Sequence, residues 1–429
     1  MAAALISRRL SLAWACALVL AGCASTGQYE SRPSPKMPGQ GPAVPPVVSA
    51  PPVAVPPATS TTPPARPPVA VPAPPVVPNE REVRALVERL LPAGIPGRAG
   101  WAGDITTAFV ALRLAPSREN VCAAMAVIEQ ESTWQADPVV PGLPKLVRKE
   151  LEARRVRYGI PSLVMEAALL KTSPDGRSYS ARIDSLKTEK QVNDLFEDMV
   201  AEIPKGKEWF GDMNPVRTAG PMQVSIAFAN DHAREKPYPY GRVAGDMRRE
   251  VFTRRGGLYF GIANLLDYPA DYSQYIYRFA DFNAGRYSSR NAAFQHAVAR
   301  LSGRSLDLDG DLLRYDKDRT PSNTPSATLQ ALDVLTSRMN MRLSEVGRDL
   351  KLDITYGFAH TPVYQRVFAL ADQTGGGFPR ETLPRIDLKS PKIQRKLTTE
   401  WFARRVDGRF RTCLERAPAG PVVVPPGSV

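Results

Sequence analysis

A proline-rich stretch near the amino end limits where this chain can fold. Eighteen prolines fall between Pro33 and Pro78, interleaved with valine, alanine, serine and threonine. This composition favours an extended polyproline II conformation and cannot build a packed core, so it predicts a semi-rigid, disordered linker. A second segment, residues 417–429, is rich in proline, glycine and valine and predicts a disordered tail. The folded part is therefore expected within residues 79–416.

The first 22 residues have the features of an export signal. Arg8 and Arg9 precede an apolar run over residues 10–21, which is too short to cross a bilayer as a helix. The run ends in Leu20-Ala21-Gly22-Cys23, which resembles a bacterial lipobox. The resemblance implies a signal peptide over residues 1–22, cleavage before Cys23, and acylation of that cysteine on sulfur and nitrogen. The alternative is an ordinary secretory signal followed by an unrelated cysteine.

A triacylated Cys23 would hold the protein at a membrane, because stable anchoring needs two or more acyl chains. Ala24 follows the cysteine. In enterobacterial sorting, which this pattern resembles, a residue other than aspartate at that position favours the outer membrane. We therefore expect a lipoprotein on the periplasmic face of a bacterial membrane, with residues 23–78 as its lipidated linker.

Two cysteines, Cys122 and Cys413, stay in the folded part after export. The periplasm is oxidising, so we expect these two to form a disulfide. Closing a loop of this length stabilises a chain by roughly 5 kcal/mol in the chain-entropy model. Two buried free thiols are the alternative.

Helical spacing of apolar residues predicts a mainly α fold. Asn79 and Glu82 form a candidate capping box for a helix over 80–91, Asp104 is a candidate cap for 105–114, and Ser117 is a candidate cap for 118–131. No second linker is evident, so we expect one helical domain with elaborations. Further helices are predicted at 143–158, 161–170, 189–203, 258–266, 289–301, 326–335, 361–372 and 398–415.

Three short strings carry the strongest functional signal: Glu131-Ser132, Gly220-Pro221-Met222-Gln223 and Phe282-Asn283-Ala284-Gly285. In this order they resemble the glutamate-serine, glycine-leucine-methionine-glutamine and tyrosine-asparagine-alanine-glycine motifs of lytic transglycosylases, which cut the glycan strands of peptidoglycan. The resemblance implies a lysozyme-like helical core, Glu131 as the catalytic residue, and no metal or organic cofactor. It also implies substrate contacts from Ser132, Met222, Gln223, Phe282 and Asn283.

Glu131 suits this chemistry because it ends a strongly apolar helix. A carboxyl against a poorly solvated wall has a raised pKa and can donate its proton to a glycosidic oxygen. Glu129, two residues earlier, lies about 200° around the helix and is expected to be solvated. The family implies that Glu131 next acts as a base on the muramic 6-hydroxyl, which gives a 1,6-anhydro product.

The chain departs from the family pattern in three ways. Pro221 replaces the usual leucine, and Phe282 replaces the usual tyrosine, whose hydroxyl is thereby lost. A long insertion, about 139–216, separates the first two strings, and within it Trp209 and Phe210 either stack on sugar or belong to the core.

Two other functions stay open. A hydrolytic muramidase would need a water-activating carboxylate, for which Asp137 and Asp212 are the candidates. A non-catalytic glycan-binding or scaffold lipoprotein would need no acid at all.

The formal net charge of +13 points to acidic partners. Five basic residues and one acidic residue precede residue 79, which leaves +9 for the rest of the chain. Export removes nucleic acid from reach, whereas the peptides of peptidoglycan carry free carboxylates. A solvated, arginine-rich surface without a dedicated partner is the alternative. The histidines at 232, 296 and 360 lack metal-ligand spacing, and we expect no metal site.

Overall fold

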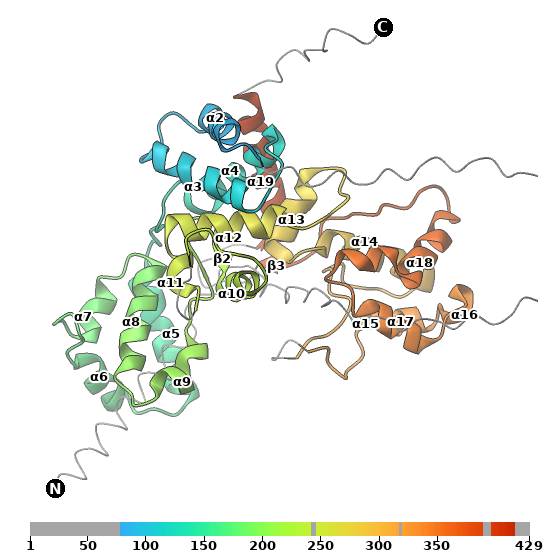
Figure 1. The fold of residues 1–429 in the computed structure, drawn as a ribbon. Coiled ribbons are helices and arrows are strands. Elements are labelled where there is room, and N and C mark those ends of the chain that lie inside the picture. Colours follow the sequence, from blue (N-terminus) through green and yellow to red (C-terminus); the bar gives the residue numbers. More distant parts are fainter. Residues whose placement is uncertain (1–77, 242–245, 317–319, 389–395, 417–429) are drawn as a thin grey trace, which may run out of the picture.

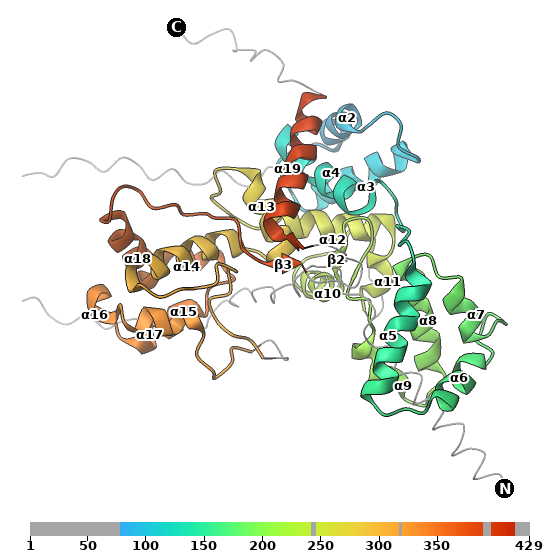
Figure 2. The same ribbon diagram turned by 180° about the vertical axis from the view of Figure 1, so that it is seen from behind.

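The computed structural model describes residues 78–241, 246–316, 320–388 and 396–416. These ranges hold eighteen α-helices, two 3-10 helices and two pairs of two-residue strands, which confirms a mainly α fold (Figures 1 and 2). The predicted signal peptide, Cys23, the proline-rich linker and the tail at 417–429 lie outside the described residues. Within the described ranges, no helix combines the length and apolar composition that crossing a membrane requires.

The first three helices of the folded part pack together with its last helix. In Figure 1, α2, α3, α4 and α19 gather at one end of the molecule, above α12 and α13. Helix α19 packs against both α4 and α13, and α12 packs against α3. The bounds are α2 Glu80–Leu90, α3 Arg98–Ala111, α4 Arg118–Ser132, α12 Arg254–Leu266, α13 Tyr275–Ala284 and α19 Thr399–Glu415.

Local sequence signals explain how two of these helices begin. The Ser117 hydroxyl accepts from the backbone N–H of Asn120 at 3.0 Å and starts α4 as predicted. Asn79 caps α2 by accepting from the N–H of Arg81, while Glu82 accepts from the Asn79 side-chain amide. In a full capping box Glu82 would accept from the backbone N–H of Asn79. Here it accepts from the side-chain amide of Asn79 instead.

The start of α3 differs from the prediction. The helix begins at Arg98 after Gly97, whose φ of 65° is a left-handed conformation that glycine adopts without strain. Asp104 lies inside the helix and caps nothing, because its carboxylate accepts from Arg254 Nε of α12 at 2.6 Å. The side chain that was predicted to cap a helix thus forms an ion pair with a residue far away in the sequence.

The predicted insertion forms a lobe of short helices, drawn in green in Figure 1. Its buried residues belong to the same hydrophobic cluster as the head, with Val147 and Phe196 in one continuous core with Val87 and Phe410. Helix α7 was not predicted. The bounds are α5 Leu143–Arg157, α6 Ser162–Leu170, α7 Tyr179–Asp184, α8 Glu189–Ala201, α9 Gly206–Phe210 and η1 Gly211–Met213.

The segment after α13 has a hydrophobic core of its own. Phe294, Phe358 and Phe368 are almost fully buried there, at the opposite side of Figure 1 from the insertion. The expectation of a single domain with elaborations did not include this second core. Its elements are α14 Ser288–Ser302, α15 Ala327–Asp333, α16 Thr336–Met339, α17 Leu343–Leu350, η2 Tyr356–His360 and α18 Pro362–Asp372.

A buried carboxylate joins the two cores. Asp281 of α13 accepts from the Tyr272 hydroxyl at 2.6 Å and from the backbone N–H groups of Tyr287 and Ser289 at 2.8 and 2.7 Å. Burial raises the pKa of this carboxyl, and these hydrogen bonds oppose the shift. Because two of the donors belong to the start of α14, Asp281 fixes the angle at which that helix leaves α13.

The strands are two short antiparallel pairs. β1 (Thr218–Ala219) pairs with β2 (Val224–Ser225), and α10 (Ile226–Glu235) follows directly. α11 (Arg248–Val251) leads into α12. β3 (Asp387–Leu388) pairs with β4 (Leu397–Thr398) immediately before α19.

Candidate active site

Glu131 lies in the last turn of α4, one residue before the helix ends. Residues 121–128 of this helix are buried, whereas the Glu131 side chain is partly exposed. Ser132 is buried, and its hydroxyl donates to the Ile128 carbonyl at 2.8 Å, so it closes the helix end. Thr133 and Trp134 follow with positive φ angles of 49° and 62° and turn the chain sharply away. Glu131 thus lies partly exposed at the end of a helix whose preceding turns are buried, whereas Ser132 offers no exposed hydroxyl to a ligand.

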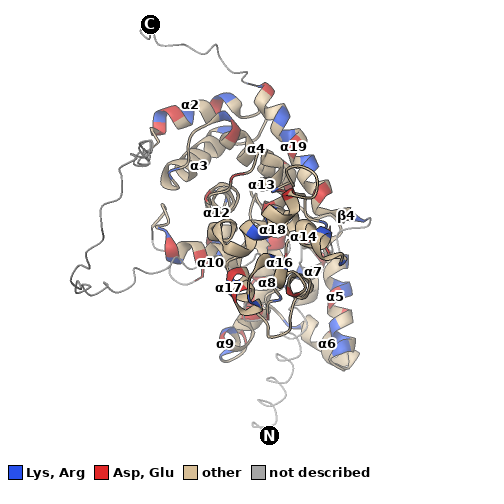
Figure 3. Cartoon of the chain, turned by 90° about the vertical axis from the view of Figure 1, so that its right-hand side faces the viewer, with Lys and Arg blue, Asp and Glu red and all other residues tan. Residues whose placement is uncertain are grey.

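Arginines from the last helix approach the end of α4. Figure 3 shows basic residues along α19, and among them Arg409 Nε lies 4.0 Å from Glu129 Oε1. Arg416 Nη2 lies 3.9 Å from the other oxygen of Glu129. Burial and the neighbouring Arg405 lower the pKa of Arg409, and the carboxylates of Glu129 and Glu131 both oppose that shift.

The prediction that Glu129 is solvated describes only part of its setting, because its side chain is 33% exposed but also lies beside two arginines. It followed from the angular spacing within one helix, which says nothing of side chains from another. Arg409 extends from α19 to the end of α4 and interacts with both glutamates. The sequence of α19 contains several arginines but no signal for which of them faces α4.

The second string forms the tip of the β1–β2 hairpin and packs closely against α12. A Cβ on Gly220, whose φ is 73°, would lie 2.3 Å from the Val251 carbonyl oxygen. A Cβ on Gly257 would lie 2.5 Å from Pro221 Cδ, and one on Gly261 would lie 2.5 Å from Met222 Cβ. Glycines at these positions are what permit the hairpin to sit directly on the helix. Pro221 stands in the turn between β1 and β2.

Met222 and Gln223 point into the protein. Met222 is 0% exposed, so its predicted contact with a sugar face finds no surface in this structure. Gln223 is 7% exposed, accepts from the Thr218 hydroxyl at 3.2 Å and donates to the Gly220 carbonyl at 3.4 Å. The predicted substrate-binding amide is thus engaged within its own hairpin, and both residues shape the turn.

The third string ends helix α13. Phe282 and Asn283 are 4% and 5% exposed and helical, and the helix ends at Gly285, whose φ is 109°. Asn283 Oδ1 accepts from the Thr399 hydroxyl at 2.9 Å, at the start of α19. Here too the structure differs from the predicted exposed contacts, because these side chains hold α19 against α13.

The three strings nevertheless converge on one core. A disulfide links Cys122 of α4 to Cys413 of α19, as the sequence predicted. The Tyr275 hydroxyl of α13 donates to Asn120 Oδ1 of α4 at 2.8 Å, and the Tyr275 ring stacks on Phe410 of α19 at 5.0 Å. Of the predicted catalytic and substrate-binding residues, Glu131 is partly exposed and the other five are buried.

The other candidate residues lie in or beside the insertion. Asp137 is hydrogen-bonded by Thr188, the cap residue of α8, and so faces the insertion lobe. Asp212 lies in η1, where its backbone carbonyl accepts from Arg217 at 2.7 Å. Trp209 is 53% exposed, whereas Phe210 belongs to the core. Among the described residues there is no group of three or more acidic, histidine or cysteine side chains that could hold a metal ion.

Comparison with known proteins places the chain in a family. Residues 94–416, which include the head from α3 onward, the insertion lobe and the second core, match the family described as "Protein of unknown function (DUF1615)". The chain is 50% identical over 336 residues to the "Uncharacterized protein YaiW" of Escherichia coli (strain K12), a match that covers 78% of this chain and 90% of that protein. No solved structure matches the chain. Because the family match spans well over half of its length, the chain belongs to the DUF1615 family.

Proposed function

We propose that this protein is a lipid-anchored lytic transglycosylase that cleaves the MurNAc–GlcNAc bond of peptidoglycan. The observation that carries the proposal is the setting of Glu131, a partly exposed carboxyl at the end of a buried apolar helix. The other two strings pack on the same core in the order that this enzyme family uses. Cys23, outside the described residues, would supply the anchor on the periplasmic face of the outer membrane.

In the proposed reaction Glu131 acts twice. Its carboxyl first donates a proton to the glycosidic oxygen as the bond from that oxygen to the muramic C1 breaks. The resulting carboxylate then removes the proton of the muramic 6-hydroxyl, whose oxygen bonds to C1 and closes the 1,6-anhydro ring. Glu131 ends protonated, and no water is consumed. Arg409 favours the ionised form that exists between the two steps, since a nearby opposite charge stabilises a carboxylate.

In this proposal the buried residues of the three strings position the surrounding backbone and do not contact the substrate. Met222 packs the hairpin against α12, Gln223 bonds within the hairpin, and Asn283 bonds to the start of α19. Direct glycan contacts would then come from other, exposed side chains. The same burial favours a second candidate, a glycan-binding lipoprotein that has kept the fold without the chemistry. For a hydrolytic muramidase, Asp137 is bound to the insertion by Thr188, which leaves the exposed Asp212 as the candidate for activating water.

The test compares Glu131→Gln with Glu129→Gln on purified sacculi, with mass spectrometry of the released muropeptides. The two variants are matched, because each removes one carboxylate that interacts with Arg409. Wild type should release 1,6-anhydro products. Glu131→Gln should lose about 10²-fold or more of that release, whereas Glu129→Gln should keep most of it.

Three results separate the candidates. Anhydro products that depend on Glu131 alone support the transglycosylase. Reducing-end products from wild type indicate hydrolysis. Sacculus binding without any product, from wild type and both variants alike, indicates a binding protein. Circular dichroism of each variant checks that the fold is unchanged.

A further inference from the structure

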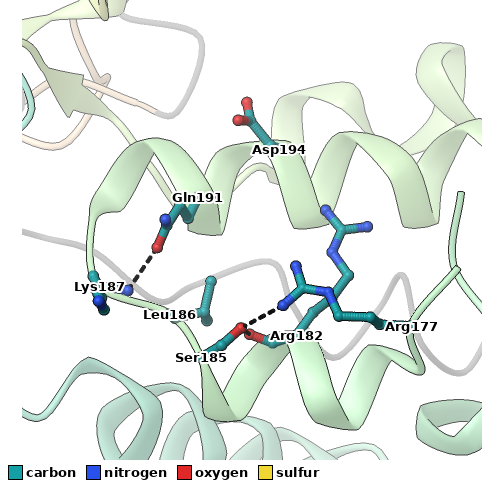
Figure 4. Close-up of a pocket in the computed structure, with 7 residues that line it drawn as sticks. All are labelled: Arg177, Arg182, Ser185, Leu186, Lys187, Gln191 and Asp194. Atoms are coloured by element: carbon teal, nitrogen blue, oxygen red, sulfur yellow. Dashed lines mark hydrogen bonds between the residues drawn. The ribbon is translucent and has the colours of Figure 1, made fainter. Parts of the chain in front are cut away.

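The insertion lobe contains a cavity that the proposed glycan chemistry does not use. Its volume is about 330 Å³, near the lower end of the range for small-molecule sites. It lies between the loop that leads into α7, the end of α7 and the first turns of α8 (Figure 4). The lining residues are Arg177, Arg182, Ser185, Leu186, Lys187, Gln191 and Asp194.

Two guanidinium groups of this lining are fixed in place. Arg182 is 9% exposed, and its Nη1 donates to Asp198 Oδ2 at 2.6 Å. Arg177 donates through Nη2 to Asp175 at 2.7 Å and through Nη1 to the Ser185 hydroxyl at 3.0 Å. Neither aspartate lines the cavity. Asp175 also lies 3.4 Å from Arg182 Nε, so both guanidinium groups already have carboxylate partners. Their remaining donors are held in place and lose little conformational entropy when a ligand binds.

The third cation, Lys187, is differently placed. Its backbone N–H donates to Gln191 Oε1 at 2.7 Å, which holds the main chain at the start of α8. Among the described residues, no carboxylate forms an ion pair with its side chain, which is exposed at the cavity.

Asp175 and Asp198, outside the lining, balance the two arginines, and the single acid of the lining does not balance Lys187. Asp194 forms an ion pair with Lys190 at 2.7 Å. In Figure 4 its carboxylate points away from Arg177 and Arg182. The cavity therefore presents fixed hydrogen-bond donors and the positive charge of Lys187 to a ligand.

We propose that this cavity binds a free carboxylate of a small ligand, and that the ligand is the peptide of the peptidoglycan substrate. The carboxylate follows from the charge and the fixed donors, because guanidinium and ammonium groups bind carboxylates through charge-assisted hydrogen bonds. The identity of the peptide rests on the proposed function. The cavity accommodates a peptide terminus and not a glycan strand. The insertion thus recognises the peptide while the end of α4 acts on the glycan.

The experiment measures binding by calorimetry with the full chain in detergent, carrying Glu131→Gln so that the probe is not cleaved. The probe is a disaccharide-peptide muropeptide with free carboxylates. Adding Lys187→Gln should raise the Kd about three- to fivefold, the loss expected for one exposed ionic contact. Lys149→Gln is the matched control. It removes the same charge from an exposed lysine of α5 in the same lobe, outside the cavity lining, and should leave the Kd unchanged.

Two further probes identify the ligand chemistry. The same muropeptide with its carboxylates amidated should bind to the parent protein at least as weakly as the free acid binds to the Lys187 variant. Inorganic phosphate, added at the concentration of the muropeptide, should not displace it. Equal binding of free and amidated probes overturns the proposal, as does equal loss from Lys149→Gln and Lys187→Gln. Displacement by phosphate would mean a general oxyanion site and overturns the assignment to a peptide carboxylate.

These outcomes are independent of the glycan chemistry. If wild type yields no anhydro product but muropeptide binding depends on Lys187, only the proposed function fails. If wild type yields anhydro product but binding does not depend on carboxylates, only the cavity assignment fails.

Discussion

The close approach of the hairpin to α12 makes Gly261→Ala a sharp test of this architecture. The new Cβ would lie 2.5 Å from Met222 Cβ and 2.6 Å from its sulfur. Non-bonded carbon atoms prefer about 3.5–4.0 Å, so this contact is roughly 1 Å too short. Because Met222 Cβ is attached directly to the hairpin backbone, a change of rotamer cannot relieve the clash, and the hairpin must move.

Two opposing effects set the size of the change. Overpacking a well-filled core costs about 1–3 kcal/mol. Replacing glycine by alanine in a helix interior contributes about 1 kcal/mol in favour of folding. Since the clash involves an atom fixed to the backbone, we place the overpacking cost in the upper part of its range and expect a net loss of about 1–2 kcal/mol. For a chain of this size each kcal/mol lowers the melting temperature by about 2–4 °C.

Gly408→Ala in α19 is the matched control. A Cβ at Gly408 meets nothing within 4 Å, so only the helix propensity changes. It should raise stability by about 0.5–1 kcal/mol. Thermal unfolding followed by circular dichroism measures both variants. If Gly261→Ala melts at or above wild type while Gly408→Ala is stabilised, the hairpin does not rest on α12 as described.

Three further predictions concern other parts of the molecule. Replacing Cys413 by serine should lower the free energy of unfolding by about 2–5 kcal/mol, as loss of a native disulfide does. The urea midpoint measures this loss, and equal midpoints of the wild type with and without reductant would contradict the prediction. Cys23→Ser should move the protein from membranes into the soluble periplasmic fraction, and a variant that resists a carbonate wash would refute lipid anchoring. Burial, with the charges of Arg286 and Lys236, lowers the pKa of His232 to about 3 from an ordinary value of 6.5, so the folded state disfavours the proton. The stability that neutral His232 gives is complete above pH 6.5 and falls as the pH drops toward 3, by about 2 kcal/mol between pH 7 and 5. Urea titrations at both pH values should show a smaller pH dependence in His232→Gln than in wild type, and an equal dependence would exclude this histidine as the cause.

Local sequence signals were reliable where the backbone N–H groups of a segment find hydrogen-bond acceptors within that same segment. Ser117 begins α4 because its hydroxyl meets an N–H only three residues away, and Thr361 begins α18 in the same way. Apolar spacing predicted α4 and α19 to within one residue at each end. These signals depend on hydrogen bonds and side-chain periodicity inside a single helix. Asp104 shows their limit, since an arginine 150 residues later takes the carboxylate that a local rule assigned to a cap.

The candidate site shows the same division between sequence and tertiary structure. The sequence by itself determined the helical class, the buried helix that carries Glu131 in its last turn, and the pairing of the two cysteines. Only the tertiary structure decided that Met222 and Asn283 turn inward, that Arg409 reaches the end of α4, and that three cations gather around a cavity in the insertion. Periodicity and capping act over a few residues along the chain. Tertiary packing decides which face of a segment is buried and which charged side chains lie beside it. These contacts join residues from distant positions in the sequence, so no local pattern encodes them.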